Sequence, residues 1–125
     1  MVAYANDHAY MKSEFGWIEI DNVLYDHDII IHQDGSVTKR SKKRSKKLKS
    51  TYGHTPLSEH ELEVIKKEKP RIIYIGTGQY GDLPITPEAK MILSQFETVI
   101  LPTPEILNML TKERRSFIAI IHVTC

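Results

Sequence analysis

The sequence predicts a single three-layer α/β domain, with a parallel βαβαβ core and antiparallel strands or hairpins added from its N-terminal half. Three observations support this fold class. The chain has 125 residues, of which 41% are hydrophobic, enough for one ordinary core. Its first part shows short strand-like patterns separated by turn signals. Its second part alternates helix and strand patterns through short links, which favours parallel strands joined by right-handed crossovers.

The domain is expected to span residues 13–125, after a loosely ordered tail over 1–12. Within it we expect a strand-rich half (13–40), a basic connector (41–56) and an alternating helix and strand half (57–125). The tail lacks the apolar stretch of a signal peptide. Apolar runs in the sequence stay far below the about 20 residues that a membrane helix needs, so no membrane span is predicted.

Four short strands are predicted in the first half, as a meander or a pair of hairpins. Turn signals separate them at Asp21-Asn22 and, most clearly, at Asp34-Gly35. The predicted strands are Gly16–Ile20, Val23–Tyr25, Asp28–His32 and Ser36–Thr38.

The second half carries capping signals where its helices should start. Ser58 followed by Glu61 is a capping box, which opens a helix to about Lys69. Thr86-Pro87 and Thr103-Pro104 each combine an N-cap residue with a first-turn proline. The predicted strands between and after these helices are Arg71–Ile75, Thr98–Leu101 and Phe117–Val123.

Several motifs in one order resemble a small, widespread α/β family of unknown function. Its animal relatives include the adipogenesis-associated domain protein and a mitochondrial assembly factor for respiratory complex I. The resemblance covers roughly residues 14–125; it implies a compact three-layer α/β fold and no reaction. The motifs that carry it are Tyr25–Ile31, Asp34–Val37, Lys49–Gly53, Ile75–Gly81, Leu101–Glu105 and Ile121–Cys125.

The segment Gly76–Gly81 matches the G-x-G-x-x-G pattern after a strand, but its context differs from that of a dinucleotide site. The next helix signal, at Thr86, comes too late for helix amides to meet a pyrophosphate, and Pro102 and Thr103 stand where an acid should hold a ribose. No cofactor is therefore predicted. The loop is interpreted as a turn that needs glycine conformations, or as backbone that holds another small ligand.

The predicted parallel strands end at one edge of the sheet, where the predicted helices begin. Ligands favour this crevice in open parallel sheets, and helix N-termini favour anions. We therefore predict a shallow site for an anion or small ligand; the alternative is a set of satisfied caps and turns. The candidate ligand-binding residues are Thr77, Gly78, Gln79, Tyr80, Thr103 and His122.

The single cysteine, Cys125, excludes an intrachain disulfide and suits a reducing compartment such as the cytoplasm. His122 and Cys125 have the spacing of a thiol and base pair, but a thiol at the chain end is poorly anchored for nucleophilic catalysis. The oxygen and nitrogen ligands of Asp26–Asp28 and His32 lack the spacing of a zinc site. No catalytic residue and no metal site is predicted.

Charge is distributed unevenly along the sequence. The basic arm, residues 39–49, holds eight Lys and Arg residues and no acid, whereas the rest of the chain has nine bases against sixteen acids. The formal net charge of +1 therefore belongs to an acidic domain with one concentrated basic segment. This excludes a uniformly basic nucleic-acid coat.

The basic arm is the predicted partner-binding surface, and a protein partner is the leading interpretation. Three alternatives stay open: contact with nucleic-acid phosphates, contact with an acidic membrane surface, and a solvated arm neutralised by the acidic remainder. The predicted function is a non-catalytic interaction or assembly-type module. The alternative is a small-ligand binding protein, or an enzyme, that uses the strand-end edge. The candidate partner-binding residues are Arg40, Lys42, Lys43, Arg44, Lys46 and Lys47.

Overall fold

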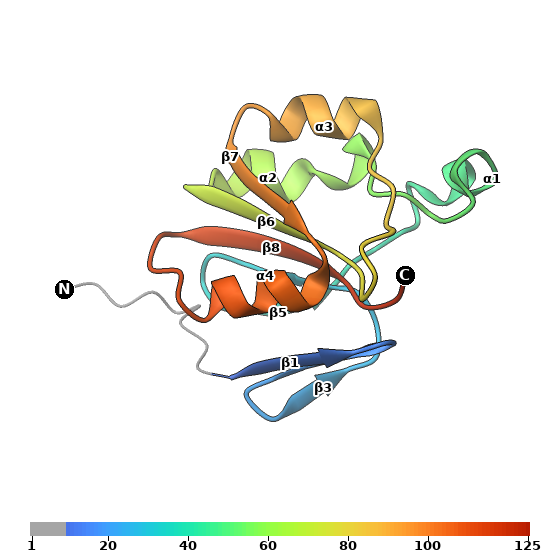
Figure 1. The fold of residues 1–125 in the computed structure, drawn as a ribbon. Helices are drawn as coiled ribbons and strands as arrows, with labels where there is room; N and C mark the ends of the chain where they lie inside the picture. Colours follow the sequence, from blue (N-terminus) through green and yellow to red (C-terminus); the bar gives the residue numbers. More distant parts are fainter. Residues whose placement is uncertain (1–9) are drawn as a thin grey trace.

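The computed structural model describes residues 10–125, and its largest element is a mixed five-stranded sheet (Figure 1). The strand order is β5-β4-β8-β6-β7. Strand β6 pairs in parallel with β7 and β8, whereas β4 pairs antiparallel with β8 and β5. The strands are β4 (Ile29–Ile31), β5 (Val37–Lys39), β6 (Ile72–Thr77), β7 (Glu97–Leu101) and β8 (Phe117–His122). This arrangement confirms the predicted α/β class.

Helices cover both faces of this sheet, which gives the predicted layers (Figure 1). The crossover from β6 to β7 places one helix on one face, and the return crossover from β7 to β8 places the next helix on the other. This follows from right-handed connections that run in opposite directions along the sheet. The helical segments are η1 (Lys46–Leu48), α1 (Lys49–Tyr52), η2 (Glu59–Glu61), α2 (Glu63–Glu68), α3 (Pro87–Leu93) and α4 (Thr103–Leu110).

The central strands are buried on both faces, and their side chains alternate between two clusters. Ile73 and Ile75 of β6 pack in one cluster with α2 and α3, while Ile72 and Tyr74 pack in the other with α4. Every residue of β6 and β8 is buried. This explains why both strands read as continuous apolar runs rather than as alternating patterns.

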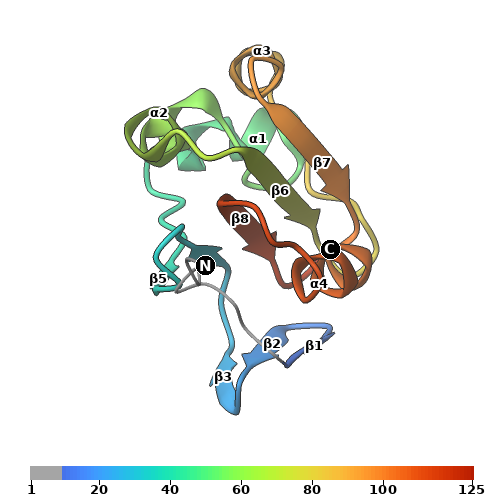
Figure 2. The same cartoon turned by 90° about the vertical axis from the view of Figure 1, so that its left-hand side faces the viewer.

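The first three strands form a separate sheet, β1 (Met11–Glu14), β2 (Trp17–Ile20) and β3 (Val23–Tyr25), which lies below α4 (Figure 2). Asp21 and Asn22 both have positive φ in the turn between β2 and β3, as the predicted turn requires. The predicted loosely ordered tail, residues 1–12, is wrong for Met11 and Lys12, which belong to strand β1. Met11 pairs with Ile20 and packs against the core. The rest of that tail, residues 1–9, lies outside the described part of the chain.

Two of the three predicted helix caps are present. Ser58 and Glu61 form the capping box, although the helix opens with a 3-10 turn. The Thr86 hydroxyl accepts a hydrogen bond from the Ala89 amide. Thr103 was predicted to be the N-cap of a helix, and this prediction was wrong. Helix α4 begins at Thr103 itself, and the Thr103 hydroxyl forms hydrogen bonds with Gly78 and His122 instead of capping the helix.

Candidate functional site at the strand-end edge

The carboxyl ends of β6 and β8 meet the start of α4 at one edge of the sheet, which we call the strand-end edge. The Thr103 hydroxyl donates to the His122 carbonyl at 2.7 Å and accepts from the Gly78 amide at 3.1 Å. The Thr103 amide donates to the Gly78 carbonyl at 2.9 Å. Topology alone predicted that these segments would meet, and in the structure they are joined by direct hydrogen bonds.

Two amides of the Gly76–Gly81 loop, and the amide of the residue that follows it, bind the last two residues of the chain. Gln79 donates to the Thr124 carbonyl at 3.0 Å, while Tyr80 and Asp82 both donate to the Cys125 carbonyl, at 3.0 and 3.3 Å. The loop therefore holds the segment that follows β8 with the same amides that were expected to hold a ligand.

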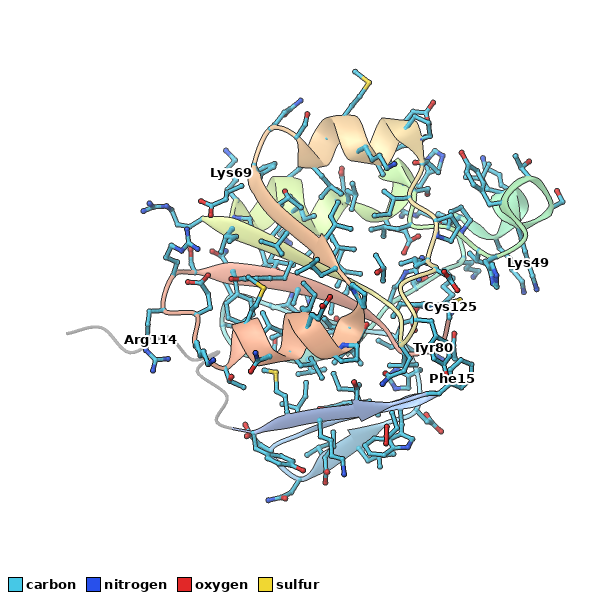
Figure 3. All side chains as sticks on the ribbon, viewed as in Figure 1. Phe15, Lys49, Lys69, Tyr80, Arg114 and Cys125 are labelled. Atoms are coloured by element: carbon cyan, nitrogen blue, oxygen red, sulfur yellow. The ribbon has the colours of Figure 1, made fainter. Side chains whose placement is uncertain are left out.

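The remaining candidate residues of this loop diverge. Thr77 is buried and lines a hollow next to β7, whereas the Tyr80 side chain is exposed. The Tyr80 ring lies 5.9 Å from the ring of Phe15, at the same end of the molecule as Cys125 (Figure 3). The Gln79 side chain accepts a hydrogen bond from Ser13 in β1. Thr77, Gln79 and Tyr80 therefore face three different surroundings.

A buried ion-pair network lies behind this edge, and sequence reasoning missed it. The Arg40 guanidinium donates to Asp28 at 2.7 Å and to Glu61 at 2.7 Å, and also to the Pro56 carbonyl at 3.0 Å. The Arg40 side chain is 1% exposed. This corrects its assignment to the partner-binding surface, because a guanidinium with three internal acceptors offers nothing to a partner.

The same network anchors the basic arm. The Ser45 hydroxyl is buried and lies 2.5 Å from both the Ser58 hydroxyl and the Glu61 carboxylate. Glu61 thus completes the capping box of η2 and also binds the arm at two points, Arg40 and Ser45. With these inward contacts made, the exposed cations of the arm are Lys39, Lys43, Arg44, Lys46, Lys47 and Lys49.

Asp28 connects the network to the end of β8. Its carboxylate accepts from His122 Nδ1 at 2.6 Å and from the Val123 amide at 2.9 Å, in addition to Arg40. Burial alone would raise the pKa of the Asp28 carboxyl, but the hydrogen bond and charge of His122, with the charge of Arg40, hold that pKa far below its usual range.

The stability of the protein should consequently fall in acid. A carboxyl with a depressed pKa stabilises the fold above the pKa of unfolded aspartate, near 4, and this contribution is lost as the pH falls toward the folded-state pKa. Once the pH is below about 4, we expect the free energy of unfolding from urea titrations to decrease by up to about 1.4 kcal/mol per pH unit for this group. The ¹³C resonance of the Asp28 carboxyl should still report an ionised group at about pH 3. A titration midpoint near 4 would contradict the assigned network.

The arm, residues 26–28 and the segment that follows β8 together form a cleft of about 720 Å³, which we call the basic cleft. Four lysines line it, while Thr55 and Thr124 contribute hydroxyls. Of the acids in its lining, Asp28 already forms ion pairs with Arg40 at 2.7 Å and with Lys42 at 3.4 Å. The lining residues are Asp26, His27, Asp28, Lys39, Arg40, Ser41, Lys42, Lys43, Lys46, Thr55, Val123 and Thr124.

The Cys125 thiol contacts His54, and not His122 as the sequence spacing suggested. The sulfur lies 3.6 Å from His54 Nδ1, whereas both ring nitrogens of His122 are used by Asp28 and Thr124. Among residues 10–125 there is no group of three or more His, Cys, Asp or Glu side chains that could hold a metal ion. No helix in this same part of the chain is long and apolar enough to cross a membrane.

Comparison with known proteins finds solved structures of the same fold. A conserved hypothetical protein from Pyrococcus horikoshii is 35% identical, with a TM-score of 0.81, covering 93% of this chain and 99% of its own. The protein MT938 is 36% identical, with a TM-score of 0.76 and coverage of 94% and 99%. A Bordetella pertussis protein described as an Mth938-like domain is 17% identical, covers 98% and 89%, and shares the fold at a TM-score of 0.55. No protein-family model and no curated protein matches the sequence.

Proposed function

Because this chain belongs to the Mth938-like family of conserved hypothetical proteins, whose descriptions state no activity, we propose a function from its own site. We propose that it binds a small anionic ligand, of the phosphate-bearing kind, in the basic cleft. The basic arm and the segment that follows β8 then act as two walls of one site. The observation that carries this proposal is the convergence of four lysines and two threonine hydroxyls on one cleft.

The charge of the basic cleft favours an anion. Lys39, Lys42, Lys43 and Lys46 bring four positive charges to the lining, and Asp26 is the one acid there that has no ion pair in the described structure. Ammonium groups attract phosphate and carboxylate as point charges, and hydroxyls add hydrogen bonds that orient them. The excess of positive charge therefore matches a ligand with at least one anionic group.

The size of the basic cleft favours a small molecule. Its volume of about 720 Å³ falls within the about 300–1,000 Å³ that is usual for ligand pockets. The lining contains no Phe, Tyr or Trp, so stacking on nucleic-acid bases has no support there. A compact phosphate ester or carboxylate suits the site better than a single-stranded nucleic acid.

Titration with inorganic phosphate, followed by amide chemical shifts, tests the proposal. The matched variants remove two charges each from the same arm: Lys43→Gln/Lys46→Gln takes them from the lining, and Arg44→Gln/Lys47→Gln from outside it. We expect the first pair to weaken phosphate binding by about fivefold to tenfold, since two exposed ion pairs are worth about 1 kcal/mol together. The second pair should change the affinity by less than about twofold.

Two results would count against the basic cleft as an anion site. Equal weakening by both pairs would mean that phosphate senses only the overall charge of the arm. Shifts confined to residues remote from Thr124 and Lys42 would place the anion elsewhere.

A second candidate function is the interaction or assembly-type module that the sequence favours. The specific observation is the exposed ring pair Phe15 and Tyr80, whose rings lie 5.9 Å apart in a tilted arrangement (Figure 3). Exposed aromatic side chains of this kind are enriched at protein interfaces. The resemblance to the animal proteins, including a respiratory complex I assembly factor, supports the same alternative. We also propose a cytoplasmic location, on the basis of the single cysteine.

A further inference from the structure

The basic cleft contains a hydroxyl that is linked to a buried carboxylate through a histidine. The Thr124 hydroxyl, in the cleft lining, lies 3.1 Å from His122 Nε2. The other ring nitrogen, Nδ1, lies 2.6 Å from Asp28 Oδ2. The chain of hydroxyl, imidazole and carboxylate therefore runs from the cleft surface into the core.

The hydrogen bonds fix the direction of this chain. Asp28 is ionised and accepts from Arg40, from the Val123 amide and from His122. When the His122 ring holds a single proton, that proton therefore lies on Nδ1. Nε2 is then an acceptor, and the partner that can donate to it is the Thr124 hydroxyl. In this tautomer the Thr124 hydroxyl can donate to Nε2 at 3.1 Å, which is closer than its other acceptor, the Cys125 sulfur, at 3.9 Å.

The fold holds these groups rigidly. His122 is the last residue of β8 and is 4% exposed, and its carbonyl accepts from Thr103. The Thr124 carbonyl is bound by the Gln79 amide. Both sides of the Thr124–His122 contact are therefore fixed by backbone hydrogen bonds, as a reacting pair requires.

We propose that Thr124 is a nucleophile, activated by His122, and that the protein hydrolyses esters of small anionic acids bound in the basic cleft. This rests on the proposed function, because the lysines would hold the anionic group of the substrate. His122 acts as the base, and Asp28 is a positioning residue that keeps the ring in the required tautomer.

The reaction balances with water as its only co-reactant. Thr124 Oγ1 bonds to the acyl carbon while its proton passes to His122 Nε2. The bond from the acyl carbon to the leaving oxygen breaks, and the leaving alkoxide takes the proton from His122. Water, deprotonated by the same ring, then releases the acid and restores the Thr124 hydroxyl. The lysines of the lining stabilise the negative oxygen that forms in both steps.

The test measures nitrophenolate release from two activated esters, the anionic 4-nitrophenyl hemisuccinate and the neutral 4-nitrophenyl acetate. We expect multiple turnovers with the anionic ester and slower release from the neutral one. Thr124→Val should reduce turnover by about 100-fold or more, and Thr124→Ser should retain it. Peptide mapping after rapid quenching should locate the acyl group on residue 124.

Neighbouring nucleophiles supply the controls. Cys125→Ala removes the adjacent thiol and should leave turnover unchanged, and lysines that react with the ester become acylated once without turning over. Thermal unfolding of Thr124→Val, compared with Thr124→Ser, verifies that a loss of turnover is not a loss of fold. The proposal is overturned by absence of turnover, by turnover that survives in Thr124→Val, or by turnover that disappears in Cys125→Ala.

Phosphate titration of the same sample separates this inference from the proposed function. Phosphate binding without turnover rejects the nucleophile and keeps the anion site. Absence of both rejects both. Turnover that depends on Thr124 but shows no preference for the anionic ester supports the nucleophile and rejects the lysines as its substrate site.

Discussion

Replacement of Arg40 by methionine is expected to lower the free energy of unfolding by about 3–5 kcal/mol, because it leaves two buried carboxylates without their common partner. Arg40 is the cation that joins Asp28 to Glu61, at 2.7 Å from each. Both carboxylate side chains are nearly inaccessible to water, with 1% and 6% exposure. Urea denaturation, with the midpoint and slope fitted separately, measures the loss.

Lys43→Met is the matched control for this prediction. It removes a positive charge from the same arm and introduces the same side chain, but Lys43 is exposed. Exposed substitutions of this kind usually change stability by less than about 0.5 kcal/mol. If Arg40→Met costs no more than Lys43→Met, the ion pairs do not hold the arm to the domain.

The position of Arg40 also shows where sequence reasoning stops. In the sequence Arg40 is one of eight cations in a basic arm without acids. Its guanidinium suits a buried ion pair better than the ammonium groups of Lys39 or Lys42 do, but the arm also contains Arg44, which is exposed. The burial of Arg40 depends on acids 12 and 21 residues away, which no local pattern connects to it.

The fold was predictable because its central elements carry strong local patterns. The apolar runs of β6 and β8 and the caps at Ser58 and Thr86 each agree with the final structure. Strand β1 was missed because its four residues are mostly polar and Met11 is its main contribution to the core. Such a short edge strand is stabilised by pairing with β2, and tertiary contacts of this kind override propensity.

The strand-end edge was predictable from topology, but the groups that fill it were not. Parallel strands joined by helices bring Gly78, Thr103 and His122 to one edge of the sheet, and the structure joins them. The amides of the glycine loop could serve a ligand or the chain itself, and local sequence does not distinguish these uses. In the structure the amides of Gln79 and Tyr80 donate hydrogen bonds to the carbonyls of Thr124 and Cys125, so these amides serve the chain itself.

Substitution of Gly78 by alanine is the other change with a large expected effect. Gly78 has φ of +102°, and a Cβ there would lie 2.0 Å from the Thr124 carbonyl oxygen and 2.9 Å from His122 Cδ2. Backbone strain and overpacking each cost about 1–3 kcal/mol. We therefore expect the free energy of unfolding to fall by about 2–4 kcal/mol in urea titrations, with the largest amide shift changes at Thr124 and Cys125.

Gly16→Ala separates strain from crowding. Gly16 has a similar φ of +95°, but nothing lies within 4 Å of the position of its Cβ. We expect it to cost only the strain, on the order of 1 kcal/mol. Equal losses in the two variants would mean that the close approach at Gly78 carries no energy. A larger loss at Gly78, accompanied by weaker phosphate binding, would mean that this glycine permits the chain end to place Thr124 in the basic cleft.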